Sequence, residues 1–555
     1  MFVINTPITF ILAALGGVVY CLGFPLTFAP AFAFGPIIGI AVVLFFFSAT
    51  DDSSQVDRSP KKALRVEIAA WLGFSMVCNL LGHYWIAATL GEFGDIPAPF
   101  NYLLASLFSL VIMPHYLIMI LLWRLIPERY NPLLQLRHPG MKSFALAIVL
   151  TSLESFTPQQ FPAHMGHAWL HLAPYLGLAP IFGVPIYSFV SFWMALGIVM
   201  LIKKRFIDYG AIVTFSLVLI ISIINPLKQI PANRRPGGPL KIRMMQPNIG
   251  NHLKLNLERG HAKAIEHTFQ LYQRLSSAPS ELGQLDLIIW PETAFPPLVN
   301  TQRMREGLEW PHPMLQKIAA QTKADLLFGG YDANPERQAG YHSQYNAAIH
   351  LSYRPEIAGN PLKFSQVYHK RILIPFGERL PLGPFGQYLR PYIQNISYFG
   401  VGKTYPLFKL KSGHRFTIAI CYEVLFYNYI RSYLNSVEQT PDFLVNLTND
   451  SWYGRTSEPY QHLFLSKWRA LEFQIPLVRM TNTGISSITY PDGSESERTS
   501  LFVATNLDLR LKLGEANSAV PTLFQQWGFL MMLPLWGVIF ILLLLGGRFQ
   551  RRRAA

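Results

Sequence analysis

The sequence predicts a multi-span α-helical membrane domain of about eight helices joined to one extra-membrane α/β domain. Of the 555 residues, 51% are hydrophobic and 14% are charged, whereas a soluble domain has about 25% charged residues. Apolar runs of membrane-spanning length recur through the first part of the chain and near its end. We therefore expect seven membrane helices in 1–225, an extra-membrane domain in 226–524, and a last membrane helix with a basic tail in 525–555.

The membrane helices are predicted from the lengths of the apolar runs. These runs lie at about 7–24, 31–49, 67–90, 100–123, 180–202, 206–225 and 525–547, and a shorter one lies at about 141–156. We count the shorter run, which reaches Glu154, because seven spans would leave its flanks on the wrong sides of the membrane. The first run lacks a basic leader and a cleavage site, so we expect a retained anchor.

Basic residues in the links between these runs indicate the orientation. The links at about 25–30, 91–99 and 157–179 contain no Lys or Arg. The basic side chains of the alternate links and the tail are Arg58, Lys61, Lys62, Arg65, Arg124, Arg129, Arg137, Lys142, Lys203, Lys204, Arg205, Arg548, Arg551, Arg552 and Arg553. Because cytoplasmic links are enriched in Lys and Arg, both termini are predicted in the cytoplasm and 226–524 on the opposite face. The net charge of +15 then reflects topology, and we expect no nucleic-acid partner.

The extra-membrane segment alternates strand-like with helix-like stretches, which predicts sheets covered by helices. Its linker-like start is rich in Pro and Gly, at 226–239. Strands are expected at 241–246, 285–290, 326–329, 366–369, 416–420, 443–448, 477–481 and 486–490. Helices are expected at about 255–276, 311–322, 423–435 and 458–474. The turn signal at 490–493 predicts antiparallel pairing of the last two strands.

Three reactive side chains follow predicted strands, where α/β folds place their chemistry. They are Glu292, Lys370 and Cys421. A thiol can attack an acyl carbon, a carboxylate can move its proton, and an ammonium can stabilise an oxyanion. A helix beginning at Cys421 would also lower the pKa of its thiol. Separation in sequence leaves their distance open, and Cys421 taken alone also fits a buried core residue.

The other two cysteines, Cys21 and Cys78, lie inside apolar runs and have no obvious partner. No metal-like spacing of cysteines and no nucleotide-binding motif occurs in the sequence. His164, His167 and His171 have the spacing of one helix face, but interfacial histidines without a carboxylate partner are more often structural. We therefore expect neither a metal nor a cofactor.

Several motifs resemble those of the nitrilase, or carbon–nitrogen hydrolase, superfamily. They are Trp-Pro-Glu-Thr-Ala at 290–294, Tyr-His-Lys-Arg at 368–371, Ile-Cys-Tyr-Glu at 420–423 and Asn-Asp-Ser-Trp-Tyr-Gly at 449–454. The resemblance implies an αββα sandwich with a Glu292–Lys370–Cys421 triad. More narrowly, the chain resembles the apolipoprotein N-acyltransferases, the membrane-embedded branch. Further matches are Pro-Phe-Gly-Glu at 375–378, Gln-His at 461–462, Arg-Ala-Leu-Glu at 469–472, Arg-Met-Thr-Asn-Thr-Gly at 479–484 and His-Tyr-Trp at 83–85.

This resemblance implies transfer of an acyl chain from a phospholipid, through a thioester on Cys421, to the amine of a diacylglyceryl-cysteine at the start of a bacterial apolipoprotein. It implies a monomer in the inner membrane with a periplasmic catalytic domain. Further residues with supporting or substrate-binding roles would be Glu378, Tyr422, Glu423, Asn449 and Trp452. Glu423 could orient Lys370 or the incoming amine, although without the motif it would fit an ordinary solvated carboxylate. Leu255 departs from the family, which usually has Trp there, and the stretch 380–400 could be a lipid-facing lid.

Two other functions remain open from the sequence. The first is a membrane-tethered amidase that uses the same triad with water as the acceptor; the predicted spans argue against it, because soluble nitrilases need none. The second is a non-catalytic lipid-binding or scaffold protein, against which the intact Glu292, Lys370 and Cys421 argue.

Overall fold

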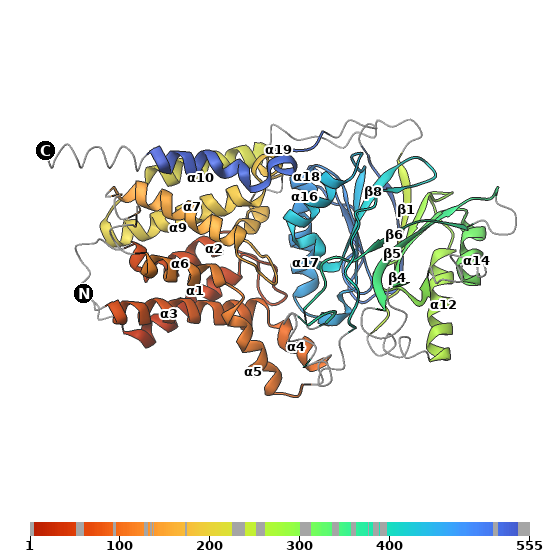
Figure 1. Cartoon of the computed structure of the whole chain (residues 1–555), viewed down its shortest axis with the longest axis horizontal. Helices are drawn as coiled ribbons and strands as arrows, with labels where there is room; N and C mark the ends of the chain where they lie inside the picture. Colours follow the sequence, from red (N-terminus) through yellow and green to blue (C-terminus); the bar gives the residue numbers. More distant parts are fainter. Residues whose placement is uncertain are drawn as a thin grey trace.

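In the computed structural model the chain forms a helical bundle and a two-sheet α/β domain that pack end to end (Figure 1). The bundle contains the helices up to residue 224 and the last helical stretch, Leu523–Ile541, and both marked ends of the chain lie on the bundle side of the molecule (Figure 1). The structure describes residues 5–50, 60–92, 96–126, 138–172, 175–224, 239–250, 261–299, 312–335, 343–356, 362–375, 377–380, 397–513 and 520–541, and positions 131, 133, 136 and 388.

The bundle is assembled from apolar helices that follow the predicted runs. They are α1 (Thr6–Cys21), α2 (Gly35–Phe45), α3 (Pro60–Val77), α5 (Phe100–Leu107), α6 (Pro114–Leu125), α7 (Pro139–Phe156), α9 (Val184–Lys204) and α10 (Tyr209–Ile224). Glycines allow their backbones to approach closely. A Cβ on Gly16 of α1 would lie 2.8 Å from the Gly39 carbonyl oxygen of α2, and one on Gly73 of α3 would lie 2.4 Å from the Phe10 carbonyl oxygen.

Among the described residues, three helical stretches are long and apolar enough to cross a membrane: Lys61–Gly82, Val184–Lys204 and Leu523–Ile541. A fourth is possible if Phe100–Leu110 and Pro114–Leu125, which are bent by 44°, count as one span. Thr6–Cys21, Gly35–Phe45 and Tyr209–Ile224 are shorter apolar helices. The structure thus supports a membrane domain, while the number of about eight spans stays a prediction.

The apolar run predicted at 67–90 corresponds to the candidate span Lys61–Gly82 and to a separate helix after it. A π-helical turn, Cys78–Gly82, follows α3. The helix ends at His83, and a new helix, α4 (Trp85–Glu92), follows it. The break is stabilised because side chains bind the carbonyl groups there: His83 Nδ1 lies 3.0 Å from the Cys78 oxygen, and Gln461 Nε2 donates to the Gly82 oxygen at 2.9 Å.

The α/β domain contains two mixed sheets. The larger has the order β12-β1-β2-β4-β5-β6, with β3 also paired to β4, and the smaller has the order β11-β10-β9-β8-β7. The strands of the larger sheet are β1 (Leu240–Gln246), β2 (Leu287–Ile289), β3 (Phe295–Val299), β4 (Asp325–Ala333), β5 (Gln344–Tyr353), β6 (Leu362–His369) and β12 (Thr505–Leu511). Those of the smaller are β7 (Phe408–Lys409), β8 (Arg415–Ile420), β9 (Phe443–Thr448), β10 (Leu477–Thr481) and β11 (Ser487–Thr489).

Helices cover both outer faces of this sandwich (Figure 1). α12 (Ala262–Ser276) and α14 (Pro313–Thr322) lie beside the larger sheet. α16 (Tyr427–Ser436), α17 (Glu458–Ser466) and α18 (Trp468–Phe473) lie between the smaller sheet and the bundle. All eight predicted strands are present, and β10 and β11 pair antiparallel as predicted.

Hydrogen bonds fix the α/β domain to the bundle, chiefly through α17 and the residues before it. Tyr84 Oη accepts a hydrogen bond from the Ser457 N–H at 3.0 Å, and the Trp85 indole donates to Gln461 Oε1 at 3.0 Å. Gln461 Nε2 donates to the carbonyl oxygens of Pro25 and Gly82. The His-Tyr-Trp motif at 83–85, which lies in the membrane part of the sequence, therefore belongs to this junction.

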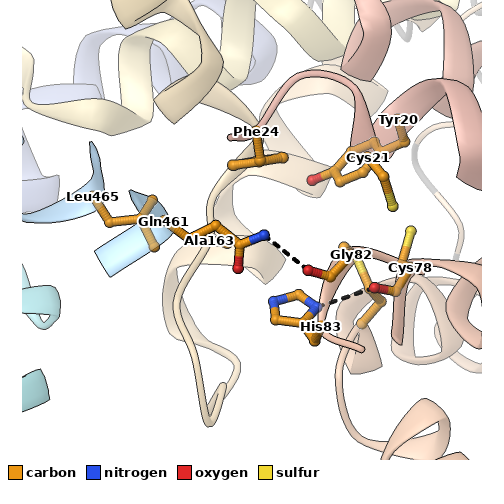
Figure 2. Close-up of a pocket in the computed structure, with 10 residues that line it drawn as sticks. Tyr20, Cys21, Phe24, Cys78, Gly82, His83, Ala163, Gln461 and Leu465 are labelled. Atoms are coloured by element: carbon orange, nitrogen blue, oxygen red, sulfur yellow. Dashed lines mark hydrogen bonds between the residues drawn. The ribbon is translucent and has the colours of Figure 1, made fainter. Parts of the chain in front are cut away.

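Figure 2 shows a cavity of about 30 Å³ at the junction, lined by residues of both parts. Cys21 and Cys78 lie on its wall as free thiols, and their side chains interact with each other. The two thiols meet because α1 packs along α3, which the sequence does not reveal.

Candidate active site

Glu292 stands in the loop after β2, with a carboxylate that is 6% exposed. The next residue, Thr293, has a left-handed backbone (φ 48°), which is uncommon for a β-branched residue. Gly329 of β4 supports this loop: its N–H donates to the Pro291 oxygen at 3.0 Å. A Cβ at Gly329 would lie 2.6 Å from the Glu292 Cα, so only glycine fits this approach.

Lys370 follows β6 directly and is completely buried. Its ammonium Nζ lies 3.0 Å from Glu292 Oε1 and 2.9 Å from Glu378 Oε1. Asn346 of β5 donates to the same two carboxylates, at 2.8 and 2.9 Å. Burial lowers the pKa of Lys370, but the Glu292 and Glu378 carboxylates outweigh it and raise the pKa well above its usual value. The lysine is therefore a permanent cation at the centre of the site.

Cys421 follows β8, is 2% exposed and has a left-handed backbone (φ 56°). Such strain in a residue with a Cβ is typical of functional sites. Cys421 begins a short 3₁₀ turn, Cys421–Leu425, and α16 starts only at Tyr427. Burial and the charge of Glu292 raise the pKa of the thiol well above its usual value, and the opposing effect of Lys370 is smaller. The expectation of a helix-lowered pKa is thus wrong, because desolvation dominates.

Glu423 is buried and accepts four hydrogen bonds, so it is no solvated helix residue. Its Oε1 accepts from the N–H groups of Arg371 and Ile372, at 2.7 and 2.9 Å. Its Oε2 accepts from the Ile420 N–H and the Tyr368 hydroxyl, both at 2.7 Å. Glu423 therefore ties the backbone after Lys370 to the backbone before Cys421, and both of its oxygens are engaged in doing so.

The remaining predicted residues lie around this centre in different ways. Tyr422 places its ring 5.9 Å from the Lys370 ammonium and donates its hydroxyl to the Leu373 oxygen at 3.0 Å. Asn449 Oδ1 accepts from the Ser451 hydroxyl at 2.8 Å, which shapes the loop after β9. Trp452 packs in a cluster with Trp85 at the bundle junction.

A buried network missed by the sequence reasoning lies beside Cys421. Asp450 Oδ2 lies 2.8 Å from the Arg479 guanidinium, and Asp450 Oδ1 lies 3.3 Å from His462 Nδ1. Burial alone would raise the pKa of Asp450, but Arg479 and His462 outweigh it and lower that pKa. These residues lie in the sequence motifs at 449–454, 461–462 and 479–484, but the motifs do not indicate that the three side chains contact one another. Their proximity follows from β9 and β10 being parallel neighbours.

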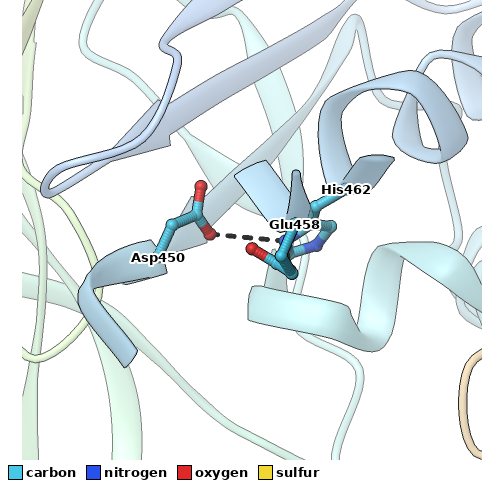
Figure 3. Close-up of side chains that lie close together, drawn as sticks. All are labelled: Asp450, Glu458 and His462. Carbon is cyan, nitrogen blue, oxygen red and sulfur yellow. Dashed lines mark ion pairs between the residues drawn. The ribbon is translucent and has the colours of Figure 1, made fainter. Parts of the chain in front are cut away.

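Asp450, Glu458 and His462 point toward one another (Figure 3). Among the described residues, they form the group whose oxygen and nitrogen atoms come within 4.8 Å of each other, as a metal site would require. The Arg479 guanidinium provides a positive charge at Asp450 of this group. 

The histidine cluster divides in the structure. His164 and His167 contact each other, with ring centroids 5.4 Å apart, at the start of a 3₁₀ helix, Met165–His171. His167 packs on Trp468 of α18, whereas His171 stacks on Phe464 of α17. His164 Nδ1 also lies 3.6 Å from Glu154 Oε2, so the expectation of no carboxylate partner is wrong for His164. The three histidines belong to the junction between the bundle and the α/β domain. Leu255 and most of the stretch 380–400 lie outside the described residues.

The mixed two-sheet sandwich contains a buried carboxylate, lysine and thiol. A family model described as carbon–nitrogen hydrolase matches this domain, at residues 241–505. A second model, the apolipoprotein N-acyltransferase N-terminal domain, matches residues 16–197. The apolipoprotein N-acyltransferase of Bdellovibrio bacteriovorus is 30% identical over 516 residues, covering 90% of this chain and 86% of that protein. The chain belongs to the apolipoprotein N-acyltransferase family.

Other relatives of the same name are more distant or cover less of the chain. The protein of Haemophilus ducreyi is 27% identical and covers 81% of this chain and 82% of its own length. That of Rickettsia typhi is 30% identical and covers 66% of this chain and 67% of its own length. Among solved structures, an amidase from Nesterenkonia sp. matches with a TM-score of 0.33 and 17% identity, over 53% of this chain and 94% of the amidase.

Proposed function

We propose that this protein transfers a fatty acyl chain from a phospholipid to the N-terminal amine of the diacylglyceryl-cysteine of bacterial apolipoproteins, the last step of lipoprotein maturation. Glu292, Lys370 and Cys421 form the catalytic triad of a ping-pong reaction. One observation carries the proposal: a buried Lys370–Glu292 ion pair of 3.0 Å stands beside a buried thiol in a domain that is bonded to an apolar helical bundle.

In the first half-reaction, Glu292 takes the proton of the Cys421 thiol, and the sulfur attacks the ester carbon of the phospholipid. A base is required because burial keeps the thiol protonated. Lys370 and backbone N–H groups stabilise the oxyanion of the tetrahedral intermediate. Glu292 then returns the proton to the glycerol oxygen, and a lysophospholipid leaves.

In the second half-reaction, the acceptor amine attacks the thioester carbon. Glu292 takes a proton from the attacking nitrogen and passes it to the departing sulfur, which restores the thiol. Glu378 and Asn346 hold Glu292 and Lys370 in place through both steps. Glu378 pairs with Lys370, and Asn346 donates hydrogen bonds to both Glu292 and Glu378. Neither step needs a cofactor.

Membrane embedding follows from the chemistry of the substrates. Both are anchored in a bilayer, and lifting an acyl chain into water costs about 0.8 kcal/mol per methylene. The bundle exposes large apolar side chains on α1, α5 and α10, including Ile11 (58%), Leu103 (61%) and Val213 (55%). Such a surface fits a lipid environment.

The proposed arrangement is a monomer with eight spans in the bacterial inner membrane. Residues 1–225 contribute seven spans, 226–524 form the periplasmic catalytic domain, and 525–555 supply the last span with a cytoplasmic tail. The alternation of basic and non-basic links supports this orientation.

The decisive experiment traps the intermediate with an alkyne-tagged phospholipid. The wild-type protein and the double variant Cys21→Ala, Cys78→Ala should both carry a hydroxylamine-sensitive label, and Cys421→Ser should carry none. A label that persists on Cys421→Ser would refute the assigned nucleophile. Ammonia release from small amides without lipid-dependent labelling would instead indicate the amidase, and absence of both activities would indicate the scaffold.

A further inference from the structure

Thr448 is the last residue of β9 and is fully buried. β9 runs parallel to β8 with Leu447 opposite Ile420, so Thr448 and Cys421 leave the sheet side by side. The Thr448 hydroxyl interacts with the Cys421 side chain and opposes the rise in the pKa of its thiol. The same hydroxyl donates to Asp450 Oδ1 at 3.2 Å.

This hydroxyl has a single proton and two competing acceptors. While Cys421 is a neutral thiol, the Asp450 carboxylate is the stronger acceptor, because hydrogen bonds to charged groups are stronger. Once the sulfur becomes negatively charged, it competes on equal terms and lies within reach of the same proton. A rotation about one side-chain bond is sufficient to change the acceptor.

Asp450 can lose this hydrogen bond without being left as an unpaired buried charge. Its Oδ2 keeps the Arg479 guanidinium at 2.8 Å, and its Oδ1 keeps His462 at 3.3 Å. Arg479 is held in turn by the Asn446 side-chain oxygen at 2.8 Å. Gly484 leaves room for the carboxylate, since a Cβ there would lie 2.0 Å from Asp450 Oδ2.

We propose that Thr448 is a further catalytic residue, whose hydroxyl donates to Asp450 while Cys421 is a thiol and to the Cys421 sulfur while that sulfur is charged. Asp450, held by Arg479 and His462, is the positioning residue that keeps the hydroxyl next to the sulfur. This assignment rests on the proposed function, in which the sulfur is charged twice.

The sulfur is charged first when its proton has moved to Glu292 and the bond to the acyl carbon is forming. The glycerol C–O bond then breaks, and its oxygen takes the proton from Glu292. The sulfur is charged again when the nitrogen–carbon bond has formed and the sulfur–carbon bond breaks, until the amine proton reaches it through Glu292. Thr448 donates a hydrogen bond in both steps and keeps its own proton. Its hydroxyl therefore stabilises the charged Cys421 sulfur each time it forms.

The test compares Thr448→Val, which keeps the shape and removes the hydroxyl, with Thr448→Ser, which keeps the hydroxyl. Each half-reaction is measured separately, by alkyne-phospholipid labelling and by the mobility shift of a diacylglyceryl-cysteine peptide. The Val variant should slow both half-reactions by roughly 10²-fold, as loss of one oxyanion donor does, and the Ser variant should remain near wild type.

A second readout follows alkylation of the Cys421 peptide by iodoacetamide against pH, with mass spectrometric detection. Loss of a donor to the thiolate raises its pKa, so the profile of Thr448→Val should move to higher pH and that of Thr448→Ser should not. Equal profiles and equal rates for Thr448→Val and wild type would overturn the assignment.

If Thr448→Val does not fold, Thr448→Ala replaces it against Thr448→Ser, since both lack the methyl group and differ only in the hydroxyl. Equal behaviour of that pair also overturns the assignment. Failure of the proposed function is recognised separately: the wild-type protein would then form no thioester, while the alkylation profiles would still report whether Thr448 donates to Cys421.

Discussion

At the reacting sulfur, burial and the neighbouring Glu292 carboxylate keep the proton on Cys421 until a base removes it. Lys370 cannot be that base, because Glu292 and Glu378 keep it charged. In the proposed reaction, these electrostatics divide the work: Glu292 moves protons and Lys370 remains a fixed cation.

Glu292→Gln should block formation of the thioacyl-enzyme, because an amide keeps the hydrogen bonds of the site but cannot take the thiol proton. We expect loss of label by at least about 10²-fold, the lower range for general acid–base catalysis. The measurement is alkyne-phospholipid trapping, with Glu281→Gln, an exposed position, as the control. Wild-type labelling of Glu292→Gln would assign the base elsewhere.

Glu423→Ala should destabilise the protein and impair both half-reactions, because four buried donors lose their acceptor. Each unsatisfied donor costs about 1–3 kcal/mol. Thermal unfolding in detergent measures the loss, and Tyr368→Phe, which removes one of the four donors, should lower stability by only about 1 kcal/mol. If Glu423→Ala unfolds like wild type and accumulates acyl-enzyme, Glu423 acts on the acceptor amine instead.

At the scale of strands and loops, glycines bring the catalytic loops together. Gly329 supports the loop of Glu292, and Gly402 accommodates the backbone at the end of β6, where its N–H donates to the Lys370 oxygen at 2.9 Å. A side chain at either position would displace Glu292 or Lys370 while leaving the sheet intact.

Gly329→Ala should therefore abolish most activity while the protein still folds. The new Cβ would lie 2.5 Å from the Pro291 oxygen, and a displacement of the base by about 1 Å can cost 10²-fold in rate. Activity and circular dichroism are measured together. Gly250→Ala, where nothing lies within 4 Å of the added Cβ, is the matched control. Equal activity of the two variants would show that the Glu292 loop adapts freely.

The packing of α1 along α3 can be tested through Cys21 and Cys78. Because these thiols interact in the structure, a mild thiol oxidant should join their peptides by a disulfide, visible by mass spectrometry without reduction. Cys78→Ser should abolish the product, and Cys421 should not enter it. Pairing of Cys421 with either thiol would contradict this packing.

Strands of the smaller sheet were predictable because β8, β9 and β10 are compact apolar runs bounded by polar residues. β3, β5, β7 and β12 were missed for physical reasons: β3 contains Pro296 and Pro297, β5 turns polar side chains such as Asn346 inward, β7 has two residues, and β12 alternates with charged side chains. Asn346 was missed together with β5. Thr448 was missed although its strand was predicted, because its proximity to Cys421 depends on strand order, which sequence periodicity does not encode.

For the whole molecule, the distribution of basic residues predicts the orientation in the membrane. A reporter fused after Arg553 should be cytoplasmic, and one inserted near Gly340 should lie on the opposite side, since basic residues occupy alternate links. Reporter activity on both faces is measured in intact cells. Both reporters on one side would refute the eight-span arrangement.

The bonds of Gln461 and Ser457 to the bundle also set the reach of the enzyme. In the arrangement proposed above, α17 is fixed to Pro25, Gly82 and Tyr84 and would hold Cys421 at a constant height above the bilayer. Each acceptor would then have to rise to that height while its lipid chains stay near the membrane. A polypeptide folded up to its lipidated residue would collide with the catalytic domain. Each unfolded residue between the fold and the lipidated residue would increase their separation by up to about 3.3–3.6 Å. Acceptor choice would then depend on the length of the unfolded tether as much as on its sequence.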